Sequence, residues 1–190
     1  GDIASRLDFC PMVGADVEGE RAVNGCNFTV SVDYKKGTTT GISASDRAKT
    51  VSAIVDPKSK AKDFYKPGHI FPLIARDGGV LVRTGHTEAA VDFMKMAGLK
   101  EVAVICEIVK NDGEMARRDD LFVFAKKHGL AIVTIEELIE YRRKKEMLVE
   151  NVASAKLPTE YGEFNMNVYR SKIHEKEHIA LVYGKVRGKK

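Results

Sequence analysis

The chain has 190 residues, 44% of them apolar and 31% charged, and a formal net charge of +4; this composition supports a packed core and argues against global disorder. No uninterrupted apolar run approaches the roughly 18 residues that a membrane-spanning helix needs. Residues 142–190 hold 12 Lys or Arg against 6 Asp or Glu, so the positive charge belongs to the C-terminal part and indicates no basic nucleic-acid groove in the main body.

The first part of the chain predicts a strand, a helix and two further strands. Residues 27–33, NFTVSVD, alternate apolar and polar side chains, as in a strand with one buried face. A loop rich in Gly, Ser and Thr then leads into a helical pattern over 46–55, which an Asp-Pro pair ends. Two short apolar runs, 69–75 and 79–83, are separated by a hairpin-like RDGG break.

The next part alternates between helical and extended patterns. Apolar residues recur at helical spacing over 87–97 and 119–128. The run 101–109 is almost continuously apolar and β-branched, as in a strand covered on both faces, and 130–134 also predicts a strand. A capping box opens an amphipathic helix over 134–146. The order of elements predicts an α+β fold, a three-layer α/β/α body with a mixed, twisted central sheet.

The pattern changes after Glu146. Residues 157–170 and 178–186 predict two strands joined by a polar, charged link. Two strands cannot close a core of their own. We therefore expect a short C-terminal β-rich extension, which is the start of a second unit.

One short stretch, RTGHT, concentrates polar groups immediately before a predicted helix. Its residues are Arg83, Thr84, Gly85, His86 and Thr87. The first N–H groups of a helix favour anions, and the guanidinium and the two hydroxyls would add hydrogen bonds to a phosphate. The glycine would let a ligand approach the backbone, and the imidazole can bind a divalent metal or transfer a proton. A helix cap beside a surface histidine is the alternative that the spacing leaves open.

Three further stretches carry candidate groups. Glu107 lies in the middle of the apolar run, where a buried carboxylate must be paired, protonated or part of a site; a salt bridge at the solvent end of the strand is the alternative. His69 follows a Pro-Gly pair on a stiff turn and has either a structural or a functional role. Residues 38–47, TTTGISASDR, offer hydroxyls and amides to a ligand or simply cap a helix.

Together these stretches resemble the 3,4-dihydroxy-2-butanone 4-phosphate synthase family of riboflavin biosynthesis. The matching elements, which cover about residues 7–143, are FTVSVD, TTGISASDRAKT, PGHIFPLIARDGGVLVRTGHTEAAVD, VICEIVKNDGEMAR and HGLAIVTIEELIEYRR. The segment ENVASAKLPTEYGEFNMNVYR and the later HIALVYG resemble the linker and opening strands of GTP cyclohydrolase II, which is often fused behind the synthase. We expect a synthase body over 1–145 that is incomplete at its N-terminus, a linker over 146–157 and an incomplete cyclohydrolase-like domain over 158–190.

The resemblance implies a lyase dependent on Mg²⁺ or Mn²⁺ that converts D-ribulose 5-phosphate to L-3,4-dihydroxy-2-butanone 4-phosphate and formate. It implies catalytic roles for His69 and Glu107 and a metal-ligand role for His86. The substrate-binding residues that it implies are Arg83, Thr84, Gly85, His86, Thr87 and Glu107. It also implies a cytoplasmic homodimer, or a plastid one if the source is a plant, with no nucleic-acid or membrane partner. Three cysteines without a CxxC spacing fit reduced thiols in such a compartment.

The chain departs from the family pattern at both ends. The family begins with an acidic loop, D-x-E-x-R-E-x-E-G-D, which supplies a metal-binding Glu and a phosphate-binding Arg, and these 190 residues contain no such loop. We therefore expect a fragment of a longer protein, with very low activity if the chain acts alone. The zinc cysteines and GTP-binding residues of the cyclohydrolase would lie beyond Lys190. The other functions considered are a non-catalytic phosphosugar-binding or interaction module and nucleic-acid binding by the basic tail.

Overall fold

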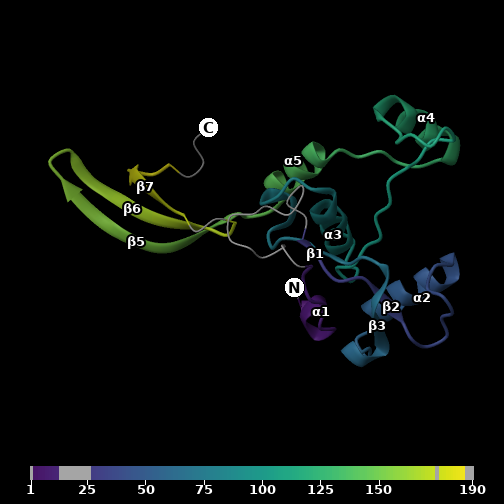
Figure 1. Ribbon diagram of the computed structural model, residues 1–190. Coiled ribbons are helices and arrows are strands. Elements are labelled where there is room, and N and C mark those ends of the chain that lie inside the picture. Colours follow the sequence, from purple (N-terminus) through teal and green to yellow (C-terminus); the bar gives the residue numbers. More distant parts are fainter. Residues whose placement is uncertain (1, 13–26, 174–175, 187–190) are drawn as a thin grey trace. The chain divides into compact units, whose positions relative to one another are not determined.

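The computed structural model describes residues 2–12, 27–173 and 176–186. The chain divides into two compact units, Gly1–Ile135 and Glu136–Lys190 (Figure 1). Among the described residues, no helix is both long and apolar enough to cross a bilayer.

The first unit combines helices with short antiparallel strand pairs. Its helices are α1 (Asp2–Arg6), α2 (Ala44–Val55), α3 (His86–Met96) and α4 (Arg118–His128), with 3₁₀ turns η2 (Ala61–Asp63) and η3 (Gly79–Leu81). Its strands are β1 (Asn27–Phe28), β2 (Val32–Tyr34), β3 (Phe64–Ile70) and β4 (Leu73–Ile74). β1 pairs with β4 and β2 pairs with β3, both antiparallel.

A small apolar core holds the β2–β3 pair in place. Leu7, Val32 and Phe64 are at most 3% exposed. Phe9 meets Phe64 edge to face, with ring centroids 5.5 Å apart, an arrangement that typically adds about 0.5–1.5 kcal/mol beyond the burial of apolar area. Ile54 of α2 completes the cluster. The core therefore fixes the two strands that carry the polar groups of the site.

The loop that precedes α2 is held by one buried carboxylate. The Oδ2 of Asp46 accepts hydrogen bonds from the hydroxyl and the amide of Thr39, at 2.8 and 3.0 Å, and from the amide of Gly41 at 3.2 Å. The hydroxyl of Ser43 caps the helix by accepting from the Asp46 amide. The bonds from Thr39, its hydroxyl first, lower the pKa of Asp46 against the opposing effect of burial.

The second unit is a helix followed by an antiparallel sheet. α5 (Ile135–Lys145) leads to β5 (Val149–Thr159), β6 (Gly162–Ser171) and β7 (Glu177–Tyr183), in the spatial order β5-β6-β7 (Figure 1). The register places Phe164 opposite Leu157 on one side and Tyr183 on the other. Because side chains alternate along a strand, this sheet has one apolar face and one face rich in Asn, Ser and Lys.

The helices of both units confirm the periodicity predictions, whereas several strands differ. The predicted strand over 79–83 is wrong, because Gly79–Leu81 form η3. The strands predicted over 101–109 and 130–134 are also wrong, since both runs are irregular apart from one isolated bridge at Val109. A strand needs a hydrogen-bonded neighbour, and neither run has a ladder partner among the described residues; Val104 is 70% exposed.

Two predicted strands are interrupted. The single strand predicted over 27–33 is divided into β1 and β2, and the one predicted over 157–170 is divided by a turn at residues 160–161 between β5 and β6. β5 begins within the segment expected to be a linker. The α+β content is confirmed with small antiparallel sheets, and the three-layer arrangement around a twisted central sheet stays a prediction.

We predict that Asp46→Asn lowers the free energy of unfolding at neutral pH. The folded-state pKa of Asp46 lies below its ordinary value of 3.8, so its charge stabilises the fold above that pH, and this contribution is lost as the pH falls through the folded-state pKa. The variant should therefore be less stable than the wild type at pH 7, and the difference should shrink below 3.8. Chemical denaturation over a pH series measures this difference. Asp77→Asn, at an exposed carboxylate, is the control and should show no such effect; equal losses in both variants would contradict the assignment.

Candidate functional site

His69 and Asp33 form a tight polar pair on neighbouring strands. The imidazole Nδ1 lies 2.6 Å from Asp33 Oδ2, and the His69 amide donates to Asp33 Oδ1 at 3.0 Å. The carboxylate is 9% exposed, whereas the imidazole is 41% exposed. Because a carboxylate can only accept, the bond assigns the proton to Nδ1 and leaves Nε2 as the basic nitrogen. The pair therefore presents an oriented base at the surface of β3.

The backbone brings His69 to this position through a bulge. β2 and β3 pair normally at Val32–Ile70 and at Asp33–Tyr65, and the register shifts between them. The intervening residues 66–69 therefore leave the ladder, as in the bulges that redirect side chains in other sheets. Gly68 permits this path, because a Cβ there would lie 2.1 Å from the Val32 carbonyl carbon.

The Thr-rich loop, residues 38–47, packs against the same His69–Asp33 pair. Gly41 has φ +83°, and a Cβ at this position would lie 2.1 Å from Asp33 Oδ2 and 2.8 Å from His69 Nδ1. The guanidinium of Arg47 donates to the carbonyl oxygens of His69 at 3.3 Å and Ile42 at 2.8 Å. The structure thus brings together two candidate stretches, 38–47 and His69, that lie apart in the sequence.

The RTGHT stretch lies at the start of α3, with Gly85 as the N-cap residue and no side-chain cap. Thr84 and His86 are exposed, and Thr87 is half-buried. Arg83 donates through Nη1 to Glu88 Oε2 at 2.5 Å. Glu88 was not singled out from the sequence, although it follows the motif directly. The structure confirms the predicted helix start and shows that Arg83 has an acidic partner there, Glu88.

Glu107 differs from its expected setting. It is exposed and lies in an irregular segment, so the expected burial within a strand is wrong. The physical reason is that the run around it has no neighbouring strand in the described part of the chain. No hydrogen bond or ion pair joins its carboxylate to the other candidate residues in that same part.

The described residues do not form a complete metal site. Nowhere in 2–12, 27–173 or 176–186 do three or more His, Cys, Asp or Glu side chains gather so that they could hold an ion. His86 alone would supply one nitrogen, whereas Mg²⁺ prefers six oxygen ligands in octahedral geometry. The described residues therefore supply at most a part of a Mg²⁺ site.

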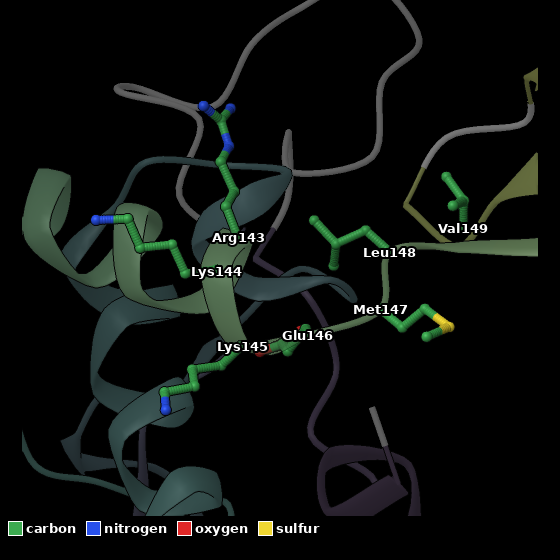
Figure 2. A pocket seen from close by; sticks show the side chains of 7 residues that line it. All are labelled: Arg143, Lys144, Lys145, Glu146, Met147, Leu148 and Val149. Carbon is green, nitrogen blue, oxygen red and sulfur yellow. The ribbon is translucent and has the colours of Figure 1, made fainter. Parts of the chain in front are cut away.

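An open pocket of about 460 Å³ lies elsewhere, at the end of α5 and the start of β5. It is lined by Arg143, Lys144, Lys145, Glu146, Met147, Leu148 and Val149 (Figure 2). Figure 2 shows the charged ends of Arg143 and Lys145 pointing to opposite sides of the ribbon. Because its cationic groups diverge, the pocket is not arranged to bind one anion. None of the candidate site residues lines it.

Comparison with known proteins settles the family. Residues 1–141 match the family model of 3,4-dihydroxy-2-butanone 4-phosphate synthase. The chain belongs to this family. Residues 150–189 match the model of GTP cyclohydrolase II, so the sequence resemblance to both is confirmed.

Curated relatives of this synthase chain are named Riboflavin biosynthesis protein RibBA. The protein of Endomicrobium trichonymphae is 53% identical over 173 residues, which is 91% of this chain and 43% of that protein. The protein of Mycobacterium marinum is 51% identical over 190 residues, or 99% of this chain and 44% of that protein. The chain thus spans less than half the length of these relatives.

Solved structures of synthases overlap the chain closely. RibBX, a two-domain synthase from A. baumannii, is 45% identical with a TM-score of 0.80, covering 96% of this chain and 53% of that one. A synthase in complex with two magnesium ions is 35% identical with a TM-score of 0.64, covering 76% and 70%. Both comparisons support an enzyme of the synthase family.

We predict that Gly41→Ala destabilises the protein more than Gly37→Ala does. Both glycines have left-handed backbones, with φ +83° and +76°, so both variants lose about 1 kcal/mol or more through backbone strain. A Cβ at Gly37 meets nothing within 4 Å, whereas one at Gly41 overlaps the Asp33 carboxylate. The difference in unfolding free energy, measured by chemical denaturation, therefore reports on the His69–Asp33 contact. Equal losses would show that Gly41 does not pack against the pair.

Proposed function

We propose that the chain carries the synthase site of a bifunctional riboflavin-biosynthesis protein and converts D-ribulose 5-phosphate to L-3,4-dihydroxy-2-butanone 4-phosphate and formate. Family membership and the names of the relatives support this proposal. The observation that carries it is the half-exposed imidazole of His69, oriented by the buried carboxylate of Asp33.

The proposed role of His69 is proton transfer at the sugar carbons. With Nδ1 bonded to Asp33, Nε2 accepts a proton from the carbon beside the carbonyl group as the enediol forms. Asp33 stabilises the imidazolium that results and keeps the ring in its orientation. The protonated ring then returns the proton during the rearrangement that precedes loss of formate. These transfers use only residues of this chain.

The proposed phosphate site is the start of α3. Gly85 supplies no side-chain cap, so the first amide groups of the helix are available to an anion. The hydroxyls of Thr84 and Thr87 and the guanidinium of Arg83 add donors of the kind that a phosphate monoester requires. The phosphate would anchor the substrate while the chemistry takes place at the other end of the sugar.

The remaining expectations from the resemblance are also proposals. We infer dependence on Mg²⁺ or Mn²⁺ with His86 as one ligand, which the neighbour solved with two magnesium ions supports for magnesium. A bound cation would supply positive charge near developing oxyanions. Glu107 as a second proton-transfer group, the homodimer, the cytoplasmic location, the three-layer body and the domain bounds 1–145, 146–157 and 158–190 belong to the same proposal.

The deciding experiment is a formate-release assay on the full-length protein with D-ribulose 5-phosphate and Mg²⁺, with the phosphorylated product identified by NMR. Equimolar formate and dihydroxybutanone phosphate are expected. Binding of the sugar phosphate without release of formate would instead support the non-catalytic phosphosugar-binding module.

We predict that His69→Ala lowers kcat by roughly 100-fold or more, the usual contribution of a positioned acid–base group. Substrate binding, measured by calorimetry, should be retained, because the phosphate contacts lie elsewhere. Asp33→Asn should lower kcat by a smaller factor, since the imidazole remains but loses its anionic partner. The control is His178→Ala, at an exposed histidine of β7. A His69→Ala enzyme with near-normal kcat would remove this residue from the mechanism.

A further inference from the structure

The first turn of α3 contains a carboxylate that is turned away from solvent and toward the loop before the helix. Glu88 is 1% exposed. Its Oε2 accepts from Arg83 Nη1 at 2.5 Å, and its Oε1 accepts from the Arg76 amide at 3.1 Å. One carboxylate oxygen is therefore bound to the RTGHT stretch itself, at Arg83, and the other to the segment that leads into it, at Arg76.

The burial of Glu88 makes the contact with Arg83 energetically important. A buried carboxylate is strongly destabilising unless it is paired and hydrogen-bonded. The Arg83 side chain, only 21% exposed, supplies that partner. An isolated arginine samples many rotamers, whereas one bonded to a rigid buried carboxylate is held in a single orientation. Glu88 thus helps to hold the guanidinium at the helix start.

Gly85 is favoured by its side-chain neighbours and not by its backbone conformation. Its backbone is extended, with φ −110° and ψ 156°, a conformation that any residue adopts. A Cβ at this position would nevertheless lie 2.0 Å from Arg83 Nη1 and 2.4 Å from Glu88 Oε2. A side chain at position 85 would have to displace the ends of Arg83 and Glu88, so glycine is needed for their contact and not for the backbone. The approach of a ligand to the backbone, which the sequence suggested, is not needed to explain it.

We propose that Glu88 is a positioning residue of the synthase site, which acts through Arg83 on the substrate phosphate, and that Gly85 is required for their contact. This inference rests on the proposed function, because Arg83 matters to turnover only if the start of α3 binds the phosphate. Glu88 itself does not touch the substrate.

Asp92 provides a matched control on the same helix. It lies one turn after Glu88, is 5% exposed and accepts from the Val80 amide at 2.9 Å. A Cβ at Gly79 would lie 2.1 Å from its Oδ1, so it too is packed against a glycine. Through the Val80 amide, Asp92 anchors η3 to α3, and its burial is similar to that of Glu88.

The test compares Glu88→Gln, Gly85→Ala and Asp92→Asn in the full-length protein, with kcat and KM for D-ribulose 5-phosphate and the Tm measured for each. Glu88→Gln should raise KM about 10-fold, as expected for disturbing a hydrogen bond to a charged group, with a smaller change in kcat. Gly85→Ala should do the same. Asp92→Asn should lower the Tm and leave KM nearly unchanged. A KM that rises equally in Glu88→Gln and Asp92→Asn, or in neither, overturns the inference.

A second measurement reports on Arg83 without using activity. Phenylglyoxal modifies guanidinium groups, and peptide mass spectrometry follows the rate at Arg83 in each variant. Loss of the anionic partner in Glu88→Gln should accelerate modification, whereas Asp92→Asn should not. An unchanged rate in an active Glu88→Gln protein overturns the positioning role and leaves the proposed function standing. If the wild-type protein releases no formate, the proposed function falls, and the role of Glu88 in turnover falls with it.

Discussion

The cost of burying negative charge organises the loops around this site. As whole residues, Asp33, Asp46, Glu88 and Asp92 are each at most 6% exposed. Each accepts a hydrogen bond from the backbone amide of a neighbouring loop or strand. A desolvated carboxylate without partners is strongly destabilising. The loops and strands are therefore held in positions from which their amides donate to these carboxylates. In the described part of the chain, no buried side-chain nitrogen or oxygen lacks a partner.

The four carboxylates differ in the side chains that they hold. Asp33 and Glu88 each also hold a nitrogen-bearing side chain, the imidazole of His69 and the guanidinium of Arg83. Asp46 holds loop amides and a hydroxyl and lies 3.8 Å from the Lys49 ammonium, and Asp92 holds the Val80 amide. The contacts of Asp33 and Glu88 orient side chains that the proposed function uses, whereas the bonds to backbone amides keep the loops in place. Because much of the order around the site comes from such polar contacts, the apolar core can be small.

Helices and motif residues were largely predictable from the sequence, whereas pairings were not. The 3.6-residue period and the capping signals predicted α2 to α5, and residue type alone singled out His69 and the RTGHT stretch. Asp33 was not predicted as a site residue because its partner, His69, lies 36 positions away along the chain. No local sequence pattern links residues at that separation. The runs at 101–109 and 130–134 have strand composition, yet composition supplies no neighbouring strand. The same missing neighbour accounts for the wrong expectation about the burial of Glu107.

The glycine between Arg83 and Glu88 has a consequence for how this sequence can diverge. Its own backbone accepts any residue, so the restriction at position 85 comes from the side chains at positions 83 and 88. A larger residue becomes acceptable there only where one of those two side chains is shortened or moves away. The three positions should therefore covary among related sequences, and an alignment that scores each column independently would miss the dependence.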